Sequence, residues 1–295
     1  MSVSQESKLV TVYMPTHNRP DLALRAIQSV LNQDYCNIEL IVCDDGSEWQ
    51  SYNKVRQLLH ESDATYIRNE KPLGACSARN RAIEIAGGEL VTGIDDDDEF
   101  DKSHVSNLVA SFDEVYSFVA ASYLEIAENG AVLRRSQSEK VTLESLLHYN
   151  RVGNQVITTT ARLREIGMFD TDLPAMQDYD TWLRLVIAFG PGLRIPTCSY
   201  IRRTDHDHSR ISSQVNKLQI AFDLLESKYE KFLKPAHIAT QKVQLKKINN
   251  EPISFFELLM WANRYNIRFC VSYFTKPVRR KIRKIYEDIA AKLGG

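Results

Sequence analysis

The sequence of 295 residues contains few cysteines and no motif built from them. Five are present, scattered along the chain, odd in number and without a Cys-x-x-Cys pair: Cys36, Cys43, Cys76, Cys198 and Cys270. Such a pattern argues against a disulfide framework and against a cysteine-based zinc site. Reduced thiols are typical of the cytoplasm, so we expect a cytoplasmic protein.

A long apolar segment and a strong net charge are also missing. No uninterrupted apolar run approaches the roughly 20 residues that span a bilayer. The nearest candidate, residues 253–274, is interrupted by Glu257, Arg264 and Arg268, and the polar residues 1–8 have no signal-peptide core. The formal net charge of −1 provides no overall attraction to nucleic acid. We therefore expect no nucleic-acid partner and a protein that is soluble or peripheral.

The first hundred residues alternate between two kinds of apolar pattern. Strand-like runs occupy residues 9–14, 38–43, 64–68 and 90–94, and helical patterns begin at Asp21 and cover residues 52–60 and 75–86. Alternation at this spacing indicates βαβ units, and thus an α/β protein with a mostly parallel sheet flanked by helices.

The rest of the chain changes character twice. Residues 115–211 are mixed, with strand-like runs at 117–126, 155–160 and 197–201. Beyond residue 212 the chain is helical in pattern and more charged. We therefore expect a main domain over residues 1–212 and a helical C-terminal appendage over residues 213–295.

The run Asp95-Asp96-Asp97-Asp98 directly follows the last of the early strands. Open α/β sheets hold their ligands at the carboxyl ends of the strands. Carboxylates gathered there favour a hard divalent cation such as Mg²⁺ or Mn²⁺, which prefers carboxylates together with substrate phosphate oxygens. An acidic turn is the alternative for this run taken alone.

Polar clusters follow the other early strands as well. They are residues 15–20, residues 44–47 (Asp-Asp-Gly-Ser), and residues 69–74, which lead into Arg79 and Asn80. Parallel strands end along one edge, so these clusters are expected to converge on one crevice. A single cluster is usually only a turn. Four clusters on one edge indicate a site.

These residues resemble the inverting family 2 glycosyltransferases of the GT-A fold. The resemblance covers about residues 9–212 and rests on Pro15-Thr16-x-Asn18-Arg19, Asp44-Asp45-Gly46-Ser47, Gly74-x-x-x-Ala78-Arg79-Asn80, Asp95-x-Asp97-Asp98, and segments 177–184 and 203–212. It implies a nucleotide-sugar half over about residues 1–100 and an acceptor half over about 101–212. It also implies metal-dependent transfer of a hexose or N-acetylhexosamine from a UDP-sugar to a saccharide acceptor, in bacterial O-antigen or capsule synthesis.

The resemblance assigns roles on the donor side. Pro15, Thr16 and Arg19 would line the uridine pocket, and Asp45 would accept a hydrogen bond from the uracil ring. Asp97 would be the direct metal ligand together with Asp95, with Asp95 or Asp96 facing the ribose or the water shell of a Mn²⁺ or Mg²⁺ ion. The donor-binding set is completed by Gly74 and Arg79.

The resemblance makes Asp178 the catalytic base, since an inverting transfer needs one carboxylate to take the acceptor proton. Trp182, one helical turn away, would form an apolar wall around the acceptor. Asp180 is the main competitor for the base, and a simple helix N-cap is the alternative for Asp178. Gln177 departs from the family, which usually has Glu there.

Two segments near the C-terminal end suggest contacts with phosphate. His206, His208 and Arg210 lie in a loop that would close over the donor diphosphate. Residues 276–286 are strongly basic with isoleucines at helical spacing, which fits either a packed helix or an anchor on anionic lipid. The resemblance adds a possible polyprenyl-diphosphate-linked acceptor at the inner, cytoplasmic face of a bacterial membrane. The aromatic-rich segment 255–274 fits either that membrane surface or a subunit interface, which would give a homodimer.

Two other functions compete with the transferase. Nucleotidyltransferases also place a carboxylate pair at strand ends, but usually carry a Gly-rich basic loop where this chain has Pro-Thr-His-Asn-Arg. A non-catalytic sugar-binding member of the fold would not need Asp97 and Asp178.

Overall fold

The structure is a computed structural model, and it describes residues 7–60, 62–127, 129–130, 132–205 and 215–275. The chain divides into two compact units, one of residues 1–143 with 151–209 and the other of residues 144–150 with 210–295. The predicted boundary at residue 212 falls outside the described residues, so this division of the domains stays a prediction.

The first unit contains a five-stranded sheet in the order β3-β2-β1-β4-β9. Its strands β1, β2, β3 and β4 are parallel, and the short β9 pairs antiparallel with β4 at one edge. The elements are β1 (Val10–Thr16), α1 (Pro20–Leu31), β2 (Ile38–Asp44), α2 (Trp49–Leu59), β3 (Thr65–Arg68), α3 (Ala75–Ile85), β4 (Leu90–Gly93) and β9 (Thr158–Thr159). The predicted α/β alternation is confirmed, with bounds close to those expected.

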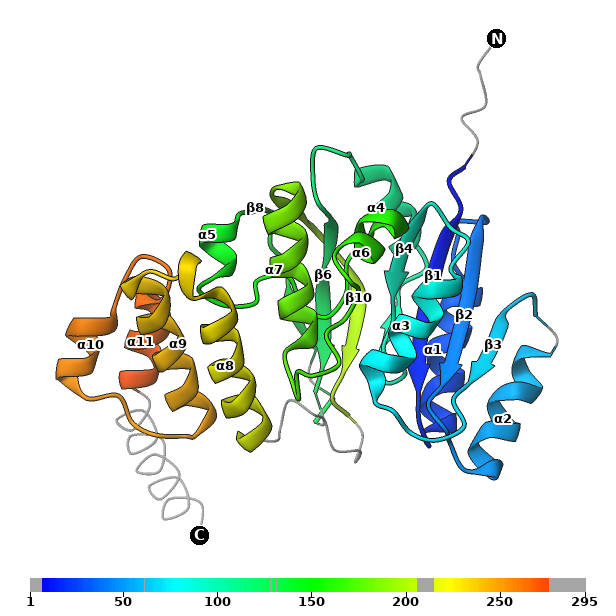
Figure 1. Cartoon of the computed structure of the whole chain (residues 1–295), viewed down its shortest axis with the longest axis horizontal. Helices are drawn as coiled ribbons and strands as arrows, with labels where there is room; N and C mark the ends of the chain where they lie inside the picture. The colour runs from blue at the N-terminus through cyan, green and yellow to red at the C-terminus, as the bar shows by residue number, and fades with distance from the viewer. Residues whose placement is uncertain (1–6, 61, 128, 131, 206–214, 276–295) are drawn as a thin grey trace, which may run out of the picture. The chain divides into compact units, whose positions relative to one another are not determined.

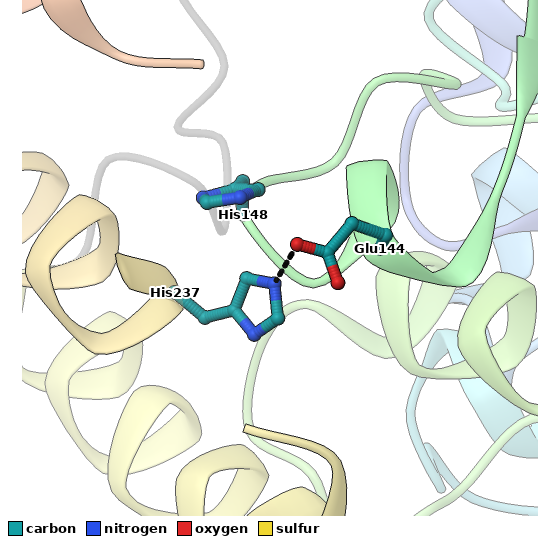
Figure 2. A group of neighbouring side chains, drawn as sticks. All are labelled: Glu144, His148 and His237. Atoms are coloured by element: carbon teal, nitrogen blue, oxygen red, sulfur yellow. Dashed lines mark ion pairs between the residues drawn. The ribbon is translucent and has the colours of Figure 1, made fainter. Parts of the chain in front are cut away.

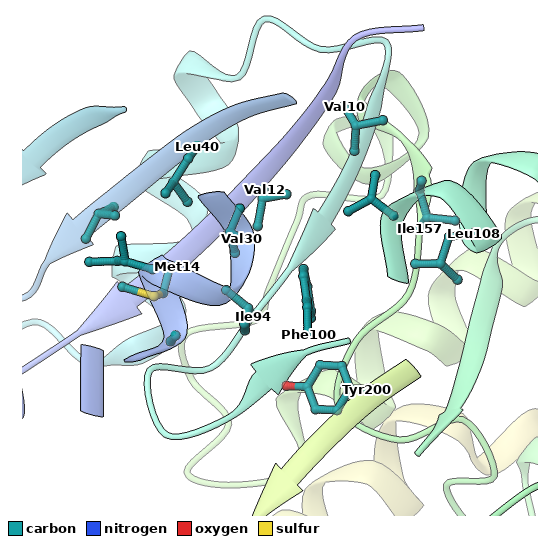
Figure 3. Close-up of a cluster of buried hydrophobic side chains, with 14 of the residues drawn as sticks. Val10, Val12, Met14, Val30, Leu40, Ile94, Phe100, Leu108, Ile157 and Tyr200 are labelled. Carbon is teal, nitrogen blue, oxygen red and sulfur yellow. The ribbon is translucent and has the colours of Figure 1, made fainter. Parts of the chain in front are cut away.

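Strand β1 shows how the sheet is held. Val10, Val12 and Met14 alternate onto one face, where they join the buried side chains of α1, such as Ile27, in the main hydrophobic core (Figure 3). Tyr13 alternates onto the opposite face, where its ring contacts Phe169. Helix α3 covers this side of β1 (Figure 1). A buried strand with both faces covered reads as a continuous apolar run, as this segment does.

A second sheet in the same unit is mixed in direction. It is ordered β5-β10-β6-β7, with β8 also paired to β10, and only β6 and β10 run parallel. Its strands are β5 (Glu99–Phe100), β6 (Val119–Ile126), β7 (Val132–Arg135), β8 (Glu139–Val141) and β10 (Gly192–Arg203). Val119 and Ile157 exchange two backbone hydrogen bonds of 2.9 and 2.8 Å, which joins this sheet to the end of the first.

Among the described residues, four more helices lie between residues 104 and 189, with α5 at the boundary between the two units. They are α4 (His104–Ser111), α5 (Leu143–Leu146), α6 (Thr160–Glu165) and α7 (Gln177–Phe189). The strand predicted over residues 155–160 is shorter in the structure: Ile157 makes an isolated bridge to Val119, β9 is limited to Thr158 and Thr159, and α6 begins at Thr160. The helix expected around Asp178 and Trp182 is present as α7.

The second unit is helical in its described part, as predicted beyond residue 212. It contains α8 (Val215–Tyr229), the 3₁₀ turn η2 (Glu230–Phe232), α9 (Pro235–Ile248), α10 (Phe255–Trp261) and α11 (Ile267–Phe274). Val243, Ile253, Cys270 and Tyr273 form its small hydrophobic core. Among the described helices, none is both long and apolar enough to cross a membrane.

Glu144, His148 and His237 gather inside this second unit (Figure 2). Two histidines and a carboxylate suit a zinc ion, but the hydrogen bonds indicate another role. His237 Nδ1 accepts a hydrogen bond from the Lys234 backbone at 3.0 Å, so the neutral ring carries its proton on Nε2, 3.3 Å from Glu144 Oε1. Lys234 Nζ lies 2.6 Å from the other oxygen of Glu144. The cluster therefore ties the start of α9 to α5, and burial lowers the pKa of His237.

Candidate active site

The four aspartates of residues 95–98 follow β4, and the loop after β1 reaches two of them. Thr16 Oγ1 donates to Asp96 Oδ2 at 2.9 Å. Arg19 Nη1 lies 3.4 Å from Asp96 Oδ1 and 3.5 Å from Asp97 Oδ2. Burial raises the pKa of Asp96 to about 6, with Arg19 opposing the shift and Asp97 adding to it. The structure thus brings together the residues expected from the ends of β1 and β4.

Asp95 is held by side chains from two other segments. Arg79 on α3 forms an ion pair with Asp95 Oδ1 at 2.8 Å, and its guanidinium stacks over the Phe169 ring at 5.3 Å. Gln155 Nε2 donates to the same oxygen at 3.1 Å while its own carbonyl accepts from Tyr13 OH at 2.9 Å. The sequence did not predict Gln155 as a site residue. Its only sequence signal is that it is a polar side chain within an apolar run.

Asp98 ties the aspartate run to the second sheet. Its carboxylate accepts hydrogen bonds from Tyr200 OH at 2.9 Å and from the Arg203 backbone at 3.0 Å, both on β10. One ligand oxygen from each of Asp95, Asp97 and Asp98 lies within 4.8 Å of the others. Three carboxylates at this spacing suit a hard divalent cation. Asp98 joins the expected pair, and the sequence alone did not single it out.

Asp45 organises the loop in front of α3. Its Oδ1 accepts from Asn69 Nδ2 at 2.7 Å and from the Leu73 backbone at 2.9 Å, and its Oδ2 accepts from the Gly74 backbone at 2.7 Å. Gly74 caps α3 with a φ of 95°, a conformation that favours glycine. The carboxylate of Asp45 is therefore buried between the ends of β2 and β3.

Gly46 allows two of these loops to touch. Its φ is 70°, and a Cβ placed on it would come within 2.7 Å of the Lys71 carbonyl carbon. Asn18 in turn joins the loops after β1 and β2, since its backbone donates to Ser47 Oγ at 2.9 Å and its side chain accepts from the Glu48 backbone at 2.8 Å. Asn18 has a φ of 54°, which asparagine tolerates better than most residues.

Pro15, also expected at the site, lies buried within β1.

Asp178 lies in the first turn of α7, as the sequence indicated, but it is not the N-cap. That position belongs to Met176, which has a left-handed backbone with a φ of 61°. Burial raises the pKa of Asp178 to about 6, and the backbone N–H of Tyr179 and the charge of Arg79 oppose the shift. Asp95 also contributes to this shift. Asp178 therefore shares its electrostatic environment with the aspartates behind β4.

Asp180, the competing residue, is held in a different setting. Its side chain is fully buried, and Arg184 Nε lies 2.8 Å from its Oδ2. Arg184 also donates to the Ile166 carbonyl at 2.6 Å. This pair fastens α7 to the end of α6, which is a structural role.

Trp182 differs from the sequence-based expectation. Its side chain is 0% exposed, its Nε1 donates to the Gly153 carbonyl at 3.0 Å, and its ring packs on Phe118 and Phe169. In this structure it offers no surface to an acceptor, and it supports the site by packing. His206, His208 and Arg210 lie outside the described residues, and so does the basic segment 276–286.

The carboxylates behind β4 and the Asp45 loop both lie at the carboxyl ends of parallel strands, where open α/β sheets bind their ligands. Residues 11–172 match the family model described as Glycosyl transferase family 2. The chain belongs to this family and is a glycosyltransferase.

Individual relatives agree with this assignment. The chain is 36% identical over 248 residues to a putative colanic acid biosynthesis glycosyl transferase, WcaA of Escherichia coli strain K12, covering 82% of this chain and 87% of the relative. It is 29% identical over 179 residues to the Escherichia coli UDP-Glc:α-D-GlcNAc-diphosphoundecaprenol β-1,3-glucosyltransferase WfgD, covering 60% and 70%. These relatives favour the transferase over a nucleotidyltransferase or a non-catalytic protein.

Solved structures share the fold. The Pyrobaculum calidifontis mannosyltransferase PcManGT, in complex with GDP-Man and Mn²⁺, matches with a TM-score of 0.60 and 17% identity over 98% of this chain and 81% of that one. Staphylococcus aureus TarS 1–349 in complex with UDP matches with a TM-score of 0.57 and 18% identity, covering 90% and 89%. The predicted GT-A fold is confirmed.

Proposed function

We propose that this chain is a metal-dependent, inverting transferase that moves a hexose or N-acetylhexosamine from a UDP-sugar to a saccharide acceptor during synthesis of a bacterial surface polysaccharide. The observation that carries the proposal is the cluster of three carboxylates from Asp95, Asp97 and Asp98. One oxygen from each lies within 4.8 Å of the others, and Arg19 pairs with Asp97. The names of the relatives WcaA and WfgD support the pathway and the type of donor.

The donor pocket is assigned to the loops after β1, β2 and β3. Pro15, Thr16 and Arg19 line it from one side and Gly74 from the other. A carboxylate offers about four lone-pair sites, and Asp45 uses three for Asn69, Leu73 and Gly74. The remaining site is suited to the ring N–H of uracil. On this proposal Asp45 both shapes the pocket and identifies the base.

The carboxylates behind β4 fit a Mg²⁺ or Mn²⁺ ion, because all their ligand atoms are hard oxygens. Such an ion, when bound, offsets negative charge on the departing diphosphate. Asp97 and Asp95 are assigned as its ligands, with Asp96 facing the ribose or the ion's water shell. Arg79 holds Asp95 in position through their 2.8 Å ion pair and keeps positive charge beside the donor.

Asp178 is assigned as the base that takes the proton from the acceptor hydroxyl. With a pKa of about 6 it is mostly ionised at neutral pH, yet basic enough to accept a proton in the transition state. Asp180 is not suited to this role, since its carboxylate is fully buried against Arg184. One base without a second nucleophilic carboxylate implies a single displacement, and therefore inversion at the anomeric carbon.

The proposed acceptor rests on the names of the relatives. WfgD is named for an acceptor on diphosphoundecaprenol, and we propose a polyprenyl-diphosphate-linked saccharide here too. His206, His208 and Arg210 are assigned to the donor diphosphate. We assign residues 1–212 to the catalytic domain and residues 213–295 to the helical appendage. The enzyme would work in the cytoplasm, at the inner face of the membrane. The helices of the appendage would contact that membrane or, as the alternative, form a homodimer.

The proposal is tested with a panel of UDP- and dTDP-sugars, with Mn²⁺ or with EDTA, scored by protection against thermal unfolding and by donor hydrolysis. We expect one UDP-sugar to raise the melting temperature, and only when the metal is present. No protection by any nucleotide sugar, or retained anomeric configuration in the product by NMR, would refute it.

A further inference from the structure

Helix α10 exposes four large apolar side chains. Phe255 is 59% exposed, Phe256 75%, Leu259 64% and Met260 67%. They are spaced at positions i, i+1, i+4 and i+5, which places them on one side of the helix. Single exposed apolar residues are ordinary on protein surfaces, but a contiguous group marks an interaction site.

The other side of α10 is already in use. Leu258 and Trp261 pack on the small core of the second unit, and Glu257 is bound by Lys246 Nζ at 2.6 Å. Within the part of the chain that the structure describes, the exposed side chains therefore lie on the side of α10 that the core of its unit does not use. They project away from a helix that its own unit has already fixed.

Helix α11 extends this apolar surface. Ile267, Val271 and Phe274 share one face at the spacing i, i+4 and i+7, and Ile267 and Val271 are exposed. The ring centroids of Phe274 and Phe255 lie 6.4 Å apart, so the two helices meet at these aromatic residues. We call the exposed side chains of α10 with this face of α11 the α10–α11 patch.

The sequence around the patch is rich in positive charge. Residues 242–275 have five Lys and Arg and two Glu, a net charge of +3, and the sequence of residues 276–284, which lie outside the described part, adds six Lys and Arg without an acid. Exposed Arg264 and Arg268 lie between and on the two helices, and within the described residues neither has an ion pair with a carboxylate. One of the two acids, Glu257, is neutralised by Lys246.

We propose that the α10–α11 patch docks onto an anionic lipid bilayer. A helix with exposed Phe and Leu in basic surroundings lies in the plane of a membrane interface, with its apolar side chains among the acyl chains and its cations among the headgroups. A second copy of the chain is the less suitable occupant. A two-fold interface places each patch on itself, so Arg264 and Arg268 would face like charges.

The test is co-sedimentation of the full chain with phosphatidylcholine vesicles, with and without phosphatidylglycerol. We expect wild type to pellet with the anionic vesicles, less so at high salt. The double variant Phe256→Ser/Leu259→Ser should partition at least tenfold less, since burying one large apolar side chain changes an equilibrium by about tenfold. The matched control Ile220→Ser/Leu224→Ser changes two exposed residues on α8, 52% and 44% exposed, and should stay within twofold of wild type.

A second measurement adds a fluorescent reporter to the patch instead of removing apolar side chains. Brominated lipid should quench an additional part of the tryptophan fluorescence in Phe256→Trp compared with wild type, which already has Trp261 on α10, and no additional part in Ile220→Trp. Equal pelleting of wild type and the α10 variant would overturn the proposal. So would a wild-type dimer in sedimentation velocity that the α10 variant abolishes without any effect on vesicles. None of these readouts requires sugar transfer, so they stand or fall apart from the proposed reaction.

Discussion

Replacing Asp178 by asparagine tests the acid–base chemistry of the site. Asparagine keeps the shape of the side chain but cannot take the acceptor proton, so transfer should fall by roughly 10²- to 10⁴-fold. The loss should be in kcat, with the donor dissociation constant nearly unchanged, because the proton moves only in the transition state. The assay is single-turnover transfer to a soluble acceptor analogue, with UDP affinity by calorimetry.

The same substitution should make the protein more stable. Burial raises the pKa of Asp178 from 3.8 to about 6, which means that its charge is unfavourable in the folded state. Each pKa unit corresponds to about 1.4 kcal/mol, so a neutral side chain should raise the free energy of unfolding at pH 7 by up to about 3 kcal/mol. Weaker hydrogen bonding to the Tyr179 backbone will reduce that gain. Urea unfolding at pH 7 and at pH 4 measures it, and the gain should fall below about 1 kcal/mol at pH 4.

Wild-type transfer should also depend on pH in one direction. Asp178 acts in its ionised form, so the rate should rise through about pH 6 and reach a plateau, with roughly a tenth of the plateau at pH 5. Asp96 has its pKa raised to the same range, so donor affinity must be measured at each pH. Asp172→Asn, an exposed change just before α7, is the control. A normal rate for Asp178→Asn, or a loss of stability with it, would refute the reasoning.

Three further substitutions separate the other roles. Asp97→Asn should abolish both activity and the metal dependence of UDP binding, and wild type that binds UDP equally well in EDTA would contradict this. Asp45→Asn should weaken UDP at least tenfold and speed amide exchange at Gly74, since the carboxylate serves both; unchanged affinity would reduce the loop to a turn. Asp180→Asn should leave Arg184 without its carboxylate and lower the free energy of unfolding by about 3 kcal/mol. A stable but inactive Asp180→Asn would move the base by two residues.

The sequence predicted the first sheet well because its signals are local. Apolar runs such as residues 38–43 and the Gly-Gly pair at residues 87–88 mark where each strand and helix begins or ends. The second sheet is different. Strand β5 has only two residues, and β10 is irregular around Pro196, where its register with β6 shifts. Pairing of this kind depends on partners far along the chain, so no short pattern reveals it.

The candidate site shows the same division. The sequence shows plainly that four aspartates follow a strand. Their hydrogen-bond partners, however, are distant in the sequence: Asp96 is bound by Thr16 and Asp98 by Arg203. Gln155 and Asn18 contribute through hydrogen bonds to Asp95 and Ser47, and the sequence around them does not reveal these contacts. Trp182 was misjudged because a tryptophan one turn from a candidate base can face either the acceptor or the core, and helical spacing does not distinguish the two.

The close contact at Gly46 has a consequence for redesign and for divergence within the family. The loops after β2 and β3 touch through backbone atoms, and Asp45 ties the second loop to the first. Neither loop can change length or carry a bulky residue at this contact without displacing the other. A graft intended to change the donor should therefore transfer residues 45–49 and 69–74 together as one cassette, and natural variants should insert or delete residues in both or in neither.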